Sequence, residues 1–97
     1  LKQVEGGATD GLSSMLDLEI SMLDGIVQQE NFHQYNIMRM RNAPINIEAH
    51  FIQSEFDPTG LGEPVLPPLM PAVSNAIFAA NGERIKTLPL SKAGYTI

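Results

Sequence analysis

The residues best suited to chemistry lie in the stretch Gly60 to Pro68, where a single carboxylate, Glu63, is held between a glycine and a proline. Gly62 has no side chain, so a bulky group can come close to the backbone there. Pro64 fixes its own φ and restricts the residue before it. A carboxylate held in this way on a tight loop can act as a general base. The alternative is that Glu63 is a solvated loop residue and the prolines only mark a turn.

Metal ligation by protein side chains has little support in the sequence. The two histidines, His33 and His50, lie far apart, and the chain has no cysteine. Thiolates and paired imidazoles are the usual ligands of zinc and many other transition metals. We therefore expect both histidines to be polar surface or hydrogen-bonded residues, and we predict no metal ligand in this chain.

Length and charge restrict the class of protein. Ninety-seven residues, 43% of them hydrophobic, make at most one small domain. The net charge is −5 and the six basic residues form no stripe, so nucleic acid is not an expected partner. The uncharged run from Pro64 to Gly82 contains four prolines, which argues against a membrane span. The sequence leaves the compartment open.

Hydrophobic periodicity predicts an α+β fold in the order helix, β-hairpin, further strand, helix, short strand. The first helix is expected over Val4 to Leu18, because Ala8, Leu12, Met15 and Leu16 fall on one helical face. Gly6, Gly7 and Gly11 interrupt it, each at a cost of about 1 kcal/mol relative to alanine. They indicate either close approach by another segment or a frayed helix start, and the sequence does not separate these alternatives.

A hairpin and two further strands are predicted in the middle and at the end of the chain. Asp24-Gly25 is a strong signal for the turn of a hairpin between about residues 18 and 32. A two-residue loop would set Glu19 opposite Glu30, which is unfavourable, so the register stays open. Residues 45–51 alternate cleanly between apolar and polar side chains and predict a further strand, and residues 84–88 predict a short one.

The second helix is expected from Pro68 to Ala80 and has no charged residue. Prolines are tolerated in a first helical turn, and Gly82 is a typical stop. Apolar residues point in most directions, and a domain of this size cannot surround them all. We expect this helix to be covered by a second copy of the chain, through self-association, or to lie partly exposed. A non-catalytic interaction module that docks through helix 68–80 is therefore the alternative to an enzyme.

Three runs in the second half of the chain carry a family resemblance: Gly-Leu-Gly-Glu-Pro at 60–64, Pro67-Pro68, and Pro-Ala-Val-Ser-Asn-Ala-Ile-Phe at 71–78. They resemble the C-terminal part of the large subunit of the molybdenum hydroxylases, the xanthine dehydrogenase and aldehyde oxidase family. The similarity is greatest to the isoquinoline 1-oxidoreductase beta subunit and aldehyde dehydrogenase large subunit branch. Gln-Val-Glu-Gly-Gly at 3–7 resembles a further family segment. Leu61, Thr9 and Asp10 depart from the residues usual in the family.

The resemblance implies that residues 1–97 are a C-terminal fragment of a larger molybdopterin-binding catalytic domain. It implies a molybdenum–pterin cofactor, a partner subunit with iron–sulfur clusters, and a small-molecule substrate, an N-heterocycle or aldehyde hydroxylated with oxygen from water. Glu63 would be the general base, and Gln3 and Gly62 would lie against the cofactor. Most of the cofactor site would come from the remainder of the large subunit. We therefore expect the 97-residue chain alone neither to hold the cofactor nor to turn over substrate.

Overall fold

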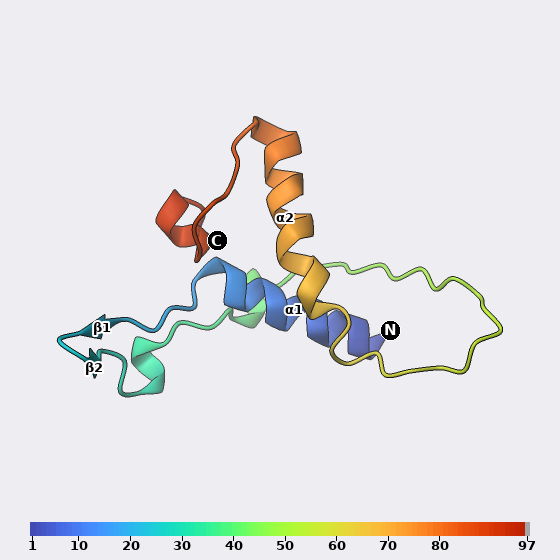
Figure 1. Cartoon of the computed structure of the whole chain (residues 1–97), viewed down its shortest axis with the longest axis horizontal. Helices are drawn as coiled ribbons and strands as arrows, with labels where there is room; N and C mark the ends of the chain where they lie inside the picture. The colour runs from blue at the N-terminus through green and yellow to red at the C-terminus, as the bar shows by residue number, and fades with distance from the viewer. Residues whose placement is uncertain (97) are drawn as a thin grey trace.

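The computed structural model describes residues 1–96, which form two helices that cross each other and a small hairpin at one end (Figure 1). Short 3-10 turns link these elements. The α+β class predicted from the sequence is confirmed to this extent. The helices are α1 (Lys2–Leu16) and α2 (Leu66–Asn81), the strands are β1 (Met22–Leu23) and β2 (Ile26–Val27), and the 3-10 turns are Phe32–Gln34, Met40–Asn42 and Leu90–Ala93.

Helix α1 is the element on which the rest of the chain is assembled. It begins and ends two residues earlier than predicted, and its predicted apolar face is at least half-buried along its length. Met15 on that face is fully buried, as is Leu90 from the last 3-10 turn, and these two side chains form the centre of a small core. The segment after the hairpin is also attached to α1, because the Met38 N–H donates to Ser13 Oγ at 2.8 Å.

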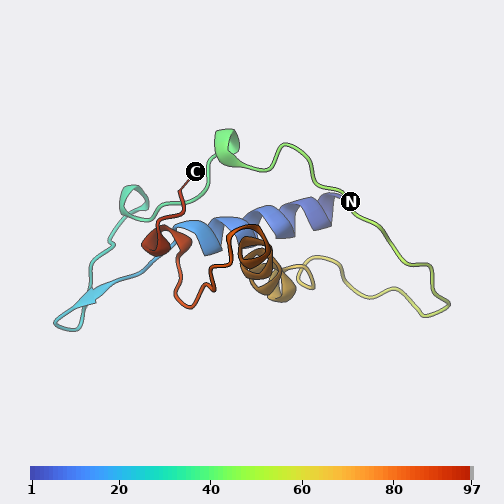
Figure 2. The ribbon, with the colours of Figure 1, turned by 90° about the horizontal axis from the view of Figure 1, so that it is seen from above.

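Helix α2 lies across α1. In Figure 2, α2 is seen almost end-on, while α1 runs horizontally across the picture. Its predicted position is confirmed, with prolines in its first turn and an end at Gly82, which has a left-handed φ of 76°. The Gly82 N–H donates to the Phe78 carbonyl at 2.7 Å. No side chain of α2 is fully buried, so the expectation that this helix lies partly exposed is confirmed.

The predicted hairpin is present, with Asp24 and Gly25 at its tip in left-handed conformations (φ 51° and 78°). Met22 pairs with Val27 and Leu23 with Ile26, so the loop has two residues. The backbone pairing of the hairpin ends with the hydrogen bond from the Gln28 N–H to the Ser21 carbonyl, at 2.9 Å. Beyond it, the Gln29 side chain bonds to Ser21 in place of further backbone hydrogen bonds. The unfavourable opposition of two glutamates is thereby avoided, and Glu19 forms an ion pair with Lys92 instead.

The other two predicted strands are wrong. Residues 45–51 run extended without a strand partner among residues 1–96, and Ile45 is fully exposed. Alternation makes a segment fit for a sheet, but a strand also needs a neighbouring backbone to pair with. Residues 84–88 form no strand because the chain turns back toward α2 after Gly82. Arg84 packs over the Phe78 ring at 3.5 Å and donates to Asn75 Oδ1 at 3.2 Å.

Candidate functional site

Glu63 lies on the turn that leads into α2. The Leu66 N–H donates to the Glu63 carbonyl at 3.0 Å, which closes the turn just before the helix begins. The Glu63 side chain is exposed, and none of the salt bridges found in residues 1–96 involves it. The turn therefore fixes the backbone of Glu63 and leaves its carboxylate open to solvent or to a ligand.

Gln3 and Gly62, the two predicted cofactor-contacting residues, are brought together although they are far apart in the sequence. A Cβ atom built on Gly62 would lie 3.2 Å from Gln3 Oε1, so the Gln3 amide occupies the space beside the bare backbone of Gly62. Gln3 belongs to the first turn of α1, and its side chain is exposed. A side-chain amide with two donors and an acceptor thus lies next to the residue that precedes Glu63.

Two of the three glycines of α1 allow the turn and the start of α2 to pack closely against the helix. A Cβ on Gly7 would lie 3.3 Å from both the Gly62 carbonyl oxygen and the Val65 Cβ atom. A Cβ on Gly11 would lie 2.5 Å from Leu69 Cδ2, inside van der Waals contact. Gly6 has no heavy atom within 4 Å of the same position. At Gly7 and Gly11, close approach by another segment is the reason for the glycine, and a frayed helix start is not.

The two histidines lie on different segments. His33 is in the 3-10 turn Phe32–Gln34, and His50 is in the extended segment, where its Nε2 atom lies 3.6 Å from Glu48 Oε2. Within residues 1–96, no three histidine or carboxylate side chains are grouped in a way that could hold a metal ion. His33 and His50 therefore take no part in the candidate site.

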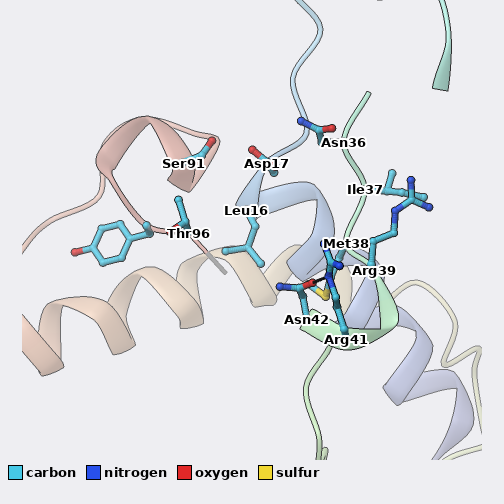
Figure 3. A pocket seen from close by; sticks show the side chains of 11 residues that line it. Leu16, Asp17, Asn36, Ile37, Met38, Arg39, Arg41, Asn42, Ser91 and Thr96 are labelled. Atoms are coloured by element: carbon cyan, nitrogen blue, oxygen red, sulfur yellow. Dashed lines mark hydrogen bonds between the residues drawn. The ribbon is translucent and has the colours of Figure 1, made fainter. Parts of the chain in front are cut away.

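A cavity of about 440 Å³ lies elsewhere, between the C-terminal end of α1, residues 36–42 and the C-terminal segment (Figure 3). Asp17 brings a negative charge to its lining, and Arg39 and Arg41 bring positive charges. No pattern in the sequence indicated this cavity, because its walls come from three segments that meet only in the fold. Gln3, Gly62 and Glu63 do not line it, so it is separate from the candidate site.

No protein-family model matches the chain, but several curated proteins do. It is 32% identical over 91 residues to the isoquinoline 1-oxidoreductase subunit beta of Brevundimonas diminuta. It is 35% identical over 91 residues to an aldehyde dehydrogenase of Gluconacetobacter polyoxogenes whose name describes it as membrane-bound and gives pyrroloquinoline-quinone. It is 33% identical over 96 residues to the xanthine dehydrogenase molybdenum-binding subunit of Escherichia coli O157:H7.

These matches cover nearly the whole of this chain and a small part of each relative. They take in 94%, 94% and 92% of the chain, but only 12%, 12% and 13% of the respective relatives. The chain thus spans about an eighth of the length of these proteins. In residues 1–96, no helix has the length and apolar character needed to cross a membrane.

Proposed function

Since this chain belongs to the molybdenum hydroxylase family, as its motifs predicted and its relatives confirm, we propose that it forms part of a molybdenum-dependent oxidoreductase. The reaction replaces a C–H bond of an electron-poor carbon, in an N-heterocycle or an aldehyde, with a C–O bond. The oxygen comes from water, and two electrons and two protons leave. The remainder of the large subunit and an iron–sulfur subunit complete the enzyme. The alternative of a non-catalytic docking module is not favoured by relatives that are oxidoreductase subunits.

The juxtaposition of Gln3 and Gly62 supports a place for the cofactor here. A pterin ring carries hydrogen-bond donors and acceptors along its edge, and the exposed Gln3 amide can satisfy either kind. Gly62 keeps the adjoining backbone free of a side chain that would fill this space. When bound, the molybdenum–pterin cofactor supplies an activated water-derived nucleophile and takes up the electrons. The metal is held by the pterin, so the chain needs no cluster of metal-binding side chains.

Glu63 is proposed as the general base. Its carboxylate is exposed, and its backbone is fixed by the turn closed at Leu66. Such a group can accept the proton of the nucleophile at a carboxylate oxygen and pass it to solvent afterwards. The observation that supports this proposal is the approach of Gln3 to Gly62, the residue directly before Glu63, on the turn that leads into α2.

The test of the reaction class is the origin of the oxygen atom. The complete enzyme, with its partner subunit, is given an N-heterocycle such as isoquinoline in ¹⁸O-labelled water under ordinary oxygen. An aldehyde is unsuitable because its hydrate exchanges oxygen with water without an enzyme. We expect one labelled oxygen atom in each product molecule by mass spectrometry. Unlabelled product from labelled water would contradict the proposal.

A further inference from the structure

Gly7 of α1 is in contact with the turn that carries Glu63, on both sides of that residue. The Cβ position of Gly7 is 3.3 Å from the Gly62 carbonyl oxygen, just before Glu63, and 3.3 Å from Val65 Cβ, just after it. Both atoms are fixed to the backbone, unlike the end of a long side chain that could turn away. A side chain at position 7 would therefore displace the turn itself, by a few tenths of an ångström for a methyl group.

The glycine at position 7 has no other explanation in the helix. Gly7 has no left-handed φ, so its backbone conformation is open to any residue. Alanine is the better helix former at such a position. Space for the turn is what remains, and Gln3, which approaches Gly62, lies one helical turn before Gly7.

We infer that Gly7 is a positioning residue that sets the distance of the Glu63 turn from α1. This inference rests on the proposed role of Glu63 as the base. A general base must lie within hydrogen-bond reach of the proton that it accepts. A misplacement of about 1 Å can cost about 10²-fold in rate. A displacement of a few tenths of an ångström should then cost several-fold, up to about 10-fold.

The helix provides a matched control at the neighbouring position. Gly6 lies in the same helix and gains the same advantage in helix formation when changed to alanine, but its Cβ position has no heavy atom within 4 Å. We expect Gly7→Ala to lower kcat of the complete enzyme several-fold, and Gly6→Ala to leave it unchanged. Gly7→Val should lower it further. Cofactor content is measured on every sample, so that kcat refers to loaded enzyme.

A readout that does not depend on turnover is hydrogen exchange of the peptide spanning residues 60–66. The Leu66 N–H is protected by its bond to the Glu63 carbonyl. Displacement of the turn should speed exchange there in Gly7→Ala and leave it unchanged in Gly6→Ala. Equal exchange and equal kcat in the two variants would overturn the inference.

Combination with Glu63→Gln separates the inference from the proposed function. If Gly7 acts through the carboxylate, Gly7→Ala should lower kcat in the native background and have no further effect in Glu63→Gln. An equal loss in both backgrounds would overturn the positioning role. If Glu63→Gln alone leaves kcat unchanged, the proposed function fails. The exchange of residues 60–66 then still decides whether Gly7 positions the turn.

Discussion

The Tyr95 side chain links the C-terminal segment to the end of α2 through two hydrogen bonds. Its hydroxyl donates to Glu83 Oε2 at 2.6 Å and accepts from Asn81 Nδ2 at 2.8 Å, which ties the C-terminal segment to the end of α2. The bond to Glu83 raises the pKa of Tyr95 above its usual value, and the bond from Asn81 acts against it to a smaller extent. The neutral phenol is therefore the form that the fold favours.

The raised pKa of Tyr95 makes the stability of the fold depend on pH. Because the pKa is raised in the folded state, the stabilisation by Tyr95 should be complete below about pH 10 and be lost as the pH rises through the higher folded value. We expect Tyr95→Phe to lower the melting temperature at pH 7 and to melt like the native chain at strongly alkaline pH. Tyr35→Phe, at the other tyrosine, serves as the control for removal of a phenol hydroxyl at pH 7. A pH-independent effect of Tyr95→Phe would contradict this assignment.

At the same scale, part of the candidate site could be predicted from local chemistry. Glycine before Glu63 and proline after it indicated a restrained carboxylate without any knowledge of the fold. Gln3 was different, since only the family resemblance pointed to it. Its approach to Gly62, and the contact of Gly7 with the turn, depend on where α1 and α2 cross. A crossing point is set by packing between elements, which one sequence does not specify.

At the scale of the elements, the crossing of α1 and α2 is the principal packing contact, and Gly11 lies in it. A Cβ atom there would lie 2.5 Å from Leu69 Cδ2. Gly11→Ala should therefore destabilise the chain by about 1 kcal/mol, at the low end of the range for overpacking, because Leu69 Cδ2 is the end of a side chain that can turn aside and because alanine favours the helix. Because the neighbour is the end of a side chain, shortening it should relieve the clash.

The test is a double-mutant cycle followed by urea unfolding. Gly11→Ala together with Leu69→Ala should cost less than the sum of the two single changes, with a coupling in the range of about 0.5–3 kcal/mol. Gly60→Ala, where the Cβ position is open, is the control and should be close to neutral. Additive costs at Gly11 and Leu69 would show that the two residues do not meet.

The elements also show what sequence patterns can predict. Both helices followed from spacing and composition, and the hairpin followed from Asp24-Gly25, because these signals are satisfied by residues close in the chain. The strands predicted at 45–51 and 84–88 failed for the opposite reason. A strand is stabilised by a partner backbone, and alternation of side chains carries no information about whether that partner is present.

At the scale of the whole molecule, residues 1–96 are more open than a compact domain. The radius of gyration is 15.9 Å, compared with about 13 Å for a compact domain of 100 residues. The hairpin and residues 43–60 extend from opposite sides of the crossed helices (Figure 1). Apolar side chains on the long segment are exposed, among them Ile45, Ile52 and Phe56. We propose that the remainder of the large subunit covers these surfaces and supplies most of the cofactor site.

Whether the Glu63 carboxylate accepts a proton during turnover is decided by kcat of Glu63→Gln in the complete enzyme. Glutamine keeps the shape and can hydrogen-bond, but it cannot take the proton. With molybdenum content measured on the same samples, kcat should fall by at least about 10²–10⁴-fold while folding and cofactor content are unchanged. Glu55→Gln, at an exposed carboxylate in the preceding segment, should have little effect. Near-normal kcat in fully loaded Glu63→Gln enzyme would rule out Glu63 as the general base.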